Sequence, residues 1–496
     1  MSGPVVFNRV RRSFYLDSVA LMRLARELAG QAGVDEAALM IGSASNKQVL
    51  ADAGLLADEG RSAGADDLVI ALRAAGEETG RNALAYAEGL LERPQTGADE
   101  AGTWRPKTLA SAAEALGDAN LALISVPGEF AADEARKALK AGLHVMLFSD
   151  NVSLDDERAL KAEARQRRRL LMGPDCGTAV IGGVPLGFAN ALPRGDVGIV
   201  SASGTGLQEV SCLIARGGCG ISHAIGVGGR DLSDSVGGIM TLEAIGTLDS
   251  DPATRRIVLI SKPPDAGVAD AVFARVSQSR KPFTVCFLGL ETVAAPPNVR
   301  FAPTLRAAAA DVVGENLTPA PPDFDAAAPS DRGWIRGLFT GGSLCAEAQV
   351  VLKAAGVPVV SNAPIPGVAA SPAEGAPGHV LLDLGASEYT VGRPHPMIDP
   401  AQRNKALASA MGEREIAVVL LDVVIGYGAH EDPAGEIAAT LAAPADGPPT
   451  VVASVCGTAD DPQGYDHQVQ ILEDAGVIVA RSNAEAAEIA LRLATG

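Results

Sequence analysis

The feature that most constrains this chain is a short apolar run followed by a loop of small residues and then by an amphipathic helix. It occupies residues 197–209, which read Val-Gly-Ile-Val-Ser-Ala-Ser-Gly-Thr-Gly-Leu-Gln-Glu. The apolar run is long enough for a buried strand, and apolar residues then repeat with helical spacing up to Gly217. A strand that turns through small residues into a helix directs backbone N–H groups at one point, where an anion can bind. The alternative is an ordinary N-capped helix after a buried strand.

The same pattern recurs at residues 334–349, where a second apolar run leads through Thr-Gly-Gly-Ser into a second helix. Each copy opens a separate α/β unit, so the two copies together predict one anion held between two facing helix N-termini. The predicted anion-binding residues are Ser201, Ser203, Gly204 and Thr205 in the first loop and Thr340, Gly341, Gly342 and Ser343 in the second.

Composition favours several α/β domains. A chain of 496 residues exceeds one hydrophobic core, and it is 47% hydrophobic but only 4% aromatic, which suits parallel sheets covered by helices. The net charge of −19 disfavours nucleic acid and anionic membranes as partners. No run reaches transmembrane length, and the N-terminus does not resemble a signal peptide. The six cysteines lack C-x-x-C spacing, so we expect free thiols in a cytoplasmic protein and predict no metal site.

The alternation of apolar runs and helical patterns predicts four α/β units. They are a small ferredoxin-like module at 1–95, a partial Rossmann-like unit at 96–190, a flavodoxin-like domain at 191–316 and a second flavodoxin-like domain at 333–496. A Pro/Ala-rich linker at 317–332 joins the last two. The second unit has no G-x-G-x-x-G turn, so it lacks a full dinucleotide fingerprint.

A glycine-rich strand end provides a candidate substrate contact. Arg230 follows Gly228 and Gly229, where a guanidinium is well placed to bind a phosphate or a carboxylate. A surface salt bridge from Arg230 to Asp231 or Asp234 is the alternative.

A histidine in the last unit is a candidate catalytic residue, together with a nearby arginine. His395 stands between two prolines, and with Arg393 it lies in a loop at the carboxyl edge of the last predicted sheet, where ligands of α/β proteins gather. His430 and Glu388 compete for the same role.

Several runs resemble a known enzyme family. Residues 106–264 resemble the α subunit of succinyl-CoA synthetase and related ADP-forming acyl-CoA ligases, and residues 334–496 resemble the carboxy-terminal domain of the β subunit. The matching runs in the first part are Val126-Pro-Gly-Glu-Phe, Met172-Gly-Pro-Asp-Cys-Gly, Gly198-Ile-Val-Ser-Ala-Ser-Gly-Thr and Gly226-Val-Gly-Gly-Arg-Asp. With the N-terminal module and the run Thr390-Val-Gly-Arg-Pro-His-Pro-Met-Ile-Asp, this order of parts is similar to the FdrA proteins.

The chain departs from the ligases at the positions that carry their phosphate relay. The ligases have a phosphorylated histidine in a Gly-His-Ala-Gly turn, whereas the corresponding residues 288–298 contain no histidine. Lys262 and prolines stand where the acid that supports that histidine is expected. The Gly-rich loop for the CoA tail is absent, and no ATP-grasp domain precedes residue 334.

The resemblance to FdrA proteins implies an acyl-CoA synthetase or a subunit of oxamate carbamoyltransferase in allantoin breakdown. Because the two anion loops remain, we expect phosphate or carbamoyl phosphate as the bound group, as in phosphorolysis of oxalurate, with a carboxylate substrate. One alternative is an ADP-forming acyl-CoA synthetase that uses CoA and obtains ATP or ADP only through a partner. The other is a non-catalytic scaffold. In each case we expect other subunits and an oligomer.

Overall fold

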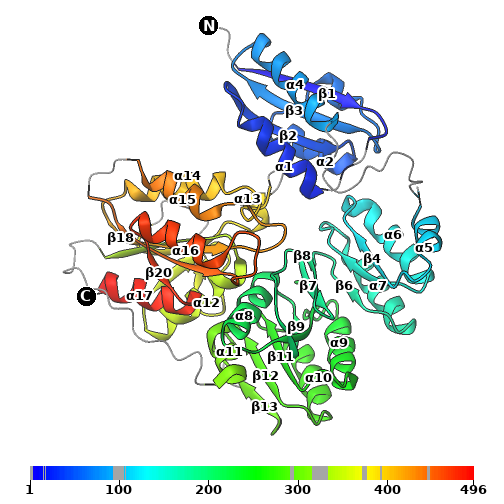
Figure 1. The fold of residues 1–496 in the computed structure, drawn as a ribbon, viewed down its shortest axis with the longest axis vertical. Coiled ribbons are helices and arrows are strands. Elements are labelled where there is room, and N and C mark those ends of the chain that lie inside the picture. The colour runs from blue at the N-terminus through cyan, green and yellow to red at the C-terminus, as the bar shows by residue number, and fades with distance from the viewer. Residues whose placement is uncertain are drawn as a thin grey trace.

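The computed structural model describes residues 4–14, 16, 18–92, 106, 108–290, 295–314, 333–370, 377–390, 394–443 and 447–495 (Figure 1). It is a mixed α/β structure with four sheets, in agreement with the predicted fold class. The four sheets follow one another along the chain.

The N-terminal module has a three-stranded antiparallel sheet in the order β1-β3-β2. Its elements are β1 (Val5–Arg11), α1 (Ser18–Ala29), β2 (Val34–Ile41), α2 (Ala44–Asp52), α3 (Asp58–Arg61), β3 (Leu68–Ala74) and α4 (Glu77–Glu92). Alternate residues of β3 enter two apolar clusters, so both faces of the sheet are covered. A ferredoxin-like fold carries four strands, and the described part of this module has three.

The second unit is a short parallel sheet in the order β4-β5-β6. It consists of α5 (Leu109–Leu116), β4 (Leu121–Ile124), α6 (Gly128–Lys140), β5 (His144–Leu147), α7 (Leu154–Gln166) and β6 (Leu171–Met172). The next two strands, β7 (Thr178–Ile181) and β8 (Val184–Gly187), form a hairpin that pairs with β10 (Ile221–Gly226) of the third unit. The predicted boundary at residue 190 therefore differs from the sheet boundary, which follows β6.

The third unit is a seven-stranded sheet in the order β13-β12-β11-β9-β10-β7-β8, parallel from β13 to β10. Its remaining elements are β9 (Arg194–Ser201), α8 (Gly204–Arg216), α9 (Ile239–Ser250), β11 (Arg256–Ser261), α10 (Ala266–Ser277), β12 (Phe283–Phe287), β13 (Val299–Phe301) and α11 (Leu305–Val313). Strand β9 lies at its centre, so the first predicted anion loop leaves the middle of the sheet at its carboxyl edge.

The fourth unit is a parallel seven-stranded sheet in the order β16-β15-β17-β14-β18-β19-β20. Its strands are β14 (Trp334–Phe339), β15 (Val359–Ser361), β16 (Ala369–Ala370), β17 (His379–Asp383), β18 (Ile416–Val424), β19 (Thr450–Cys456) and β20 (Ile478–Ala480). Its helices are α12 (Gly342–Ala354), α13 (Ser387–Thr390), α14 (Ala401–Met411), α15 (Pro433–Leu441), α16 (Tyr465–Asp474) and α17 (Asn483–Thr495). The second predicted loop leaves β14, again at the middle of its sheet.

The third and fourth units pack against each other through α8, α11, α12 and α17 (Figure 1). One apolar cluster continues across this boundary, and it includes Leu213 and Val312 on one side and Leu344 and Ile489 on the other. The buried side chain of Asn190 also joins the units, because its Nδ2 donates to the Ile425 carbonyl oxygen at 2.8 Å and to Asp461 Oδ2 at 2.7 Å. The sheets of the third and fourth units are therefore fixed in position relative to each other.

Two carboxyl groups are buried in this boundary. Glu209 of α8 accepts a hydrogen bond from the Asn483 amide at 3.1 Å, and Glu347 of α12 accepts one from Asn483 Nδ2 at 2.8 Å. Burial, with the neighbouring charge of Glu209 as a second cause, raises the pKa of Glu347 to about 7. Burial likewise raises the pKa of Glu209.

Stability should therefore fall as the pH rises through neutrality. The pKa of Glu347 in the folded chain lies above its ordinary value of 4.5. The contribution of the protonated carboxyl to the free energy of unfolding is therefore complete below pH 4.5 and is lost as the pH rises through about 7. We expect a lower thermal unfolding midpoint at about pH 8.5 than at about pH 6, and a smaller difference in Glu347→Gln. Glu473→Gln, at an exposed position on α16, should keep the wild-type difference. An equal difference in all three proteins would contradict the assignment.

Candidate anion-binding site

The two predicted loops meet at the boundary between the third and fourth units. Ser203 Oγ and Ser343 Oγ lie 2.5 Å apart, although the two residues are separated by 140 positions in the chain. A Cβ on Gly341 would lie 2.9 Å from Thr205 Cγ2, so the loops are also in van der Waals contact. Helices α8 and α12 thus begin side by side (Figure 1).

Only some of the hydrogen-bond donors of the first loop are free to bind an anion. The buried Ser201 hydroxyl donates to the Ser203 carbonyl oxygen at 2.6 Å and accepts from the Ser203 amide at 3.0 Å, so it shapes the loop. Ser203 caps α8 by accepting from the Gly206 amide at 3.0 Å. Within the described residues, the amides of Gly204 and Thr205 have no protein partner, and Gly204 is exposed. These two amides are the donors that an anion can reach here.

The second loop already binds an internal carboxylate. Asp422 of β18 accepts from the Thr340 amide at 2.7 Å, from Thr340 Oγ1 at 3.1 Å and from the Gly341 amide at 2.7 Å. In this structure the donors of Thr340 and Gly341 are thus occupied by a carboxylate of the same chain, and anion binding by these two residues stays a prediction. In the part of the chain that the structure describes, the amides of Gly342 and Ser343 have no protein partner.

A buried arginine, Arg403, contacts Asp422. Burial raises the pKa of Asp422 to about 6, and the two amide hydrogen bonds and the charge of Arg403 oppose that shift. Arg403 is also buried, donates to the Asp422 carbonyl oxygen at 3.4 Å and has a pKa lowered by burial to about 10. The second loop is thus held by the buried carboxylate of Asp422, and the buried guanidinium of Arg403 contacts the same residue.

An acid and a lysine border the two helix N-termini. A Cβ on Gly342 would lie 2.6 Å from Asp383 Oδ2, which places this carboxylate against the start of α12. Burial raises the pKa of Asp383, and the charge of Lys262 opposes that rise. Lys262 is exposed and directly follows β11, the neighbour of β9. Lys262 was not among the predicted site residues, although a cation at the carboxyl end of a central strand is a signal for an anion site.

The predicted catalytic histidine lies behind the second loop. His395 Nδ1 accepts from the Met397 amide at 3.2 Å, and a Cβ on Gly385 would lie 2.7 Å from both His395 Nε2 and the Thr340 carbonyl oxygen. Burial lowers the pKa of His395 to about 4, so the imidazole is neutral at physiological pH. Its predicted partner Arg393 lies outside the described residues, and the catalytic role of both remains a prediction.

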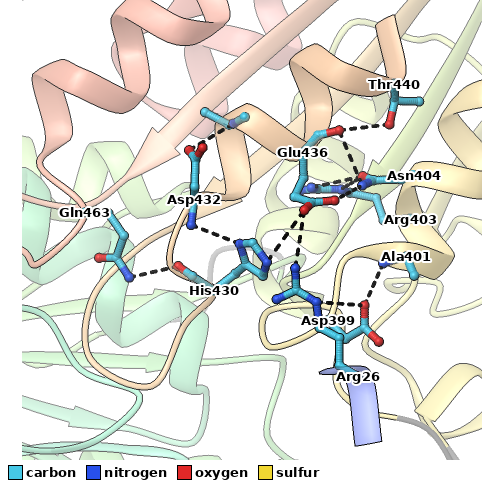
Figure 2. A network of polar contacts seen from close by, with 12 residues as sticks. Arg26, Asp399, Ala401, Arg403, Asn404, His430, Asp432, Glu436, Thr440 and Gln463 are labelled. Carbon is cyan, nitrogen blue, oxygen red and sulfur yellow. Dashed lines mark hydrogen bonds and ion pairs between the residues drawn. The ribbon is translucent and has the colours of Figure 1, made fainter. Parts of the chain in front are cut away.

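The two competitors for that role have other contacts. Glu388 Oε1 accepts from Asn362 Nδ2 at 2.7 Å. His430 belongs to a network of polar contacts with Glu436, Asp432 and Gln463 (Figure 2), and its Nδ1 accepts from the Asp432 amide at 3.0 Å.

Arg230 is tied to the second unit. Its Nη2 donates to the Val152 carbonyl oxygen and forms an ion pair with Glu157 Oε2, each at 2.8 Å, while 48% of its side chain is exposed. The alternative prediction, a salt bridge from Arg230 to Asp231 or Asp234, is therefore wrong, because Glu157 is the partner. The preceding turn packs tightly at Gly228, where a Cβ would lie 2.4 Å from the Pro174 carbonyl oxygen. A Cβ on Gly229 would be in ordinary van der Waals contact with the Ala202 carbonyl oxygen of the first loop, at 3.9 Å. Substrate binding by Arg230 stays a prediction.

The described residues contain no group of three or more His, Cys, Asp or Glu side chains arranged to hold a metal ion. Within the same residues, no helix is long and apolar enough to cross a membrane.

Two family models match the chain. Residues 338–493 match the CoA-ligase model, and residues 4–106 match the model described as the heavy metal-associated domain of AllF. The second stretch contains neither cysteine nor histidine in this chain, so it lacks the thiolate and imidazole ligands that soft metals prefer.

Individual relatives match different shares of the chain. The uncharacterized protein YahF of Escherichia coli (strain K12) is 42% identical over 495 residues, which is 96% of both chains. The succinate–CoA ligase [ADP-forming] subunit alpha 1 of Archaeoglobus fulgidus is 29% identical over 191 residues, which span 37% of this chain and 62% of that protein. A solved dinucleotide-forming acetyl-coenzyme A synthetase 1 of Ca. Korarchaeum cryptofilum matches 75% of this chain and 82% of its own at 15% identity, with a TM-score of 0.32.

The contact between the second loop and Asp422 yields a prediction about stability. Asp422→Asn turns one acceptor oxygen into an amide that faces backbone N–H groups, which should destabilise the chain by about 1–3 kcal/mol. Asp460→Asn, at an exposed position on the same sheet edge, should leave the unfolding midpoint unchanged. Thermal unfolding of both variants measures this difference. Equal midpoints would show that the Asp422 contacts do not hold the loop.

Proposed function

The chain belongs to the FdrA-like family, and we propose that it is the phosphate-handling subunit of an enzyme that transfers a carbamoyl or acyl group. The observation that carries this proposal is the contact between Ser203 and Ser343, which joins the N-termini of α8 and α12. Helix N-termini attract anions through unpaired amides and the helix dipole. Two such ends at one place, next to the exposed Lys262, suit phosphate or an acyl phosphate.

The donor set in this proposal is smaller than the sequence suggested. It comprises the amides of Gly204, Thr205, Gly342 and Ser343, and the one hydroxyl proton that the hydrogen bond between Ser203 and Ser343 leaves free. Because Asp422 and Asp383 lie close to the second loop, an incoming anion meets negative charge there. Lys262 is the group that offsets this repulsion.

The reaction that fits such a site is phosphorolysis of a ureido acid such as oxalurate, or its reverse. A phosphate oxygen attacks the ureido carbonyl carbon, the bond from that carbon to the oxamate nitrogen breaks, and the nitrogen takes the phosphate proton. Carbamoyl phosphate and oxamate result. The amides at the helix ends would hold the phosphate and the developing oxyanion. Arg230 or Arg393 would bind the substrate carboxylate, with the neutral His395 behind the second loop.

An ADP-forming acyl-CoA synthetase is the second candidate, because residues 338–493 match the CoA-ligase model. The residues present do not fit the CoA tail, since the second unit has no Gly-rich turn before β4 and its described sheet begins with that strand. ATP or ADP would come from a partner subunit. Acid-labile labelling of this chain by γ-labelled ATP would favour this candidate, and a scaffold role would show neither labelling nor phosphate binding.

Phosphate binding and carbamoyl phosphate formation test the proposal. Lys262→Gln and Ser203→Ala should each weaken phosphate binding to the chain about tenfold or more, because each removes a donor to an anion. Calorimetry measures that affinity, and the complex reconstituted with its partner subunits should lose oxalurate phosphorolysis in parallel. Lys140→Gln, at the exposed end of α6, is the matched control for the lysine and should bind as the wild type does.

Loss of the cap makes Ser203→Ala less stable by about 1 kcal/mol, so its unfolding midpoint must be measured beside its affinity. Unchanged phosphate affinity in both folded variants would show that the site lies elsewhere.

A further inference from the structure

A cavity of about 270 Å³ lies between the N-terminal module and the fourth unit. Its lining comprises Arg23, Gly426, Tyr427, Gly428, Ala429, Glu431, Pro462 and Gln463. Most of these residues follow the carboxyl ends of β18 and β19, the sheet edge where small ligands bind in α/β proteins. None of the predicted anion-binding residues lines this cavity.

The floor of the cavity is a rigid glycine turn. Gln463 holds this turn on both sides, because its Oε1 accepts from the Gly426 amide and its Nε2 donates to the Gly426 carbonyl oxygen, both at 3.0 Å. Gln463 Nε2 also donates to the His430 carbonyl oxygen at 3.0 Å, and the Tyr427 amide donates to Ala189 at 2.8 Å. The shape of the floor is therefore set before any ligand arrives.

The N-terminal module provides the opposite wall. Arg26 of α1 reaches Glu436 at 3.3 Å and Asp399 at 3.9 Å in the fourth unit (Figure 2). Arg23 precedes Arg26 by three residues, so both side chains lie on one face of α1. The docking contacts of Arg26 thus place Arg23 at the cavity.

The two charges in the lining are opposite and unpaired. Arg23 and Glu431 are both exposed, and within the described residues neither forms an ion pair or a side-chain hydrogen bond. Two opposite charges in one cavity that do not meet leave room for a ligand that carries the complementary charges. The ring of Tyr427, with 43% of the residue exposed, and Pro462 offer apolar surface beside them.

We propose that this cavity binds a free amino acid as a zwitterion, with its carboxylate on Arg23 and its ammonium on Glu431. The side chain of the amino acid would lie against Tyr427 and Pro462. Such a ligand would bridge the N-terminal module and the fourth unit, and its binding would stabilise their contact. This site is separate from the phosphate site and does not depend on it.

The test is a thermal-shift screen of the full chain with each of the twenty common amino acids, followed by calorimetry of those that raise the unfolding midpoint. At least one should bind, whereas acetate and methylammonium, which carry one charge each, should not. Arg23→Gln and Glu431→Gln should each weaken that binding about tenfold or more.

Arg81→Gln is the matched control, because Arg81 is exposed on α4 of the same module and forms an ion pair with Glu77 away from the cavity. It should keep the wild-type affinity. The proposal is overturned if no amino acid binds at millimolar concentration, or if the Arg23 and Glu431 variants bind as tightly as Arg81→Gln does.

Discussion

The packing of α8 against α12 is the interaction on which the candidate site depends. Helix α8 begins with the Ser203 cap and α12 begins after Gly341 without a side-chain cap, and a single helix N-terminus carries only about half a positive charge. The apolar cluster shared by the third and fourth units brings the two ends together, and the buried bonds of Asn190 fix their relation. The separation of 140 residues between Ser203 and Ser343 shows that only the assembled chain forms this arrangement.

An anion that enters the candidate site meets both attractive and repulsive charges. The chain carries a net charge of −19, and Asp383 and Asp422 lie beside the second loop. An anion that enters must gain more from amides and from Lys262 than it loses to these acids. The proposed binding therefore relies on Lys262 and on the few donors that the helix ends leave unpaired.

Local patterns predicted the strands and helices that carry the site, since strand, small-residue loop and helix are encoded within a dozen residues. Contacts that join distant segments could not be read in this way. The pairing of Asp422 with Thr340 and Gly341, and that of Arg230 with Glu157, depend on how separate units pack. Helices α11 and α17 were not predicted, although they complete the helical layer between the large sheets.

The cavity and the second loop share one sheet edge, and a chain of direct contacts joins them. The His430 amide, next to the glycine turn, donates to the Met397 carbonyl oxygen at 2.8 Å. The Met397 amide donates to His395, which packs beside Gly385 at the carbonyl of Thr340. Direct contacts thus connect the turn that lines the cavity with the segment that supports the second loop. The N-terminal module reaches this sheet through the ion pairs of Arg26 with Glu436 and Asp399, so the module, the cavity and the candidate anion site all lie along one edge of the fourth unit.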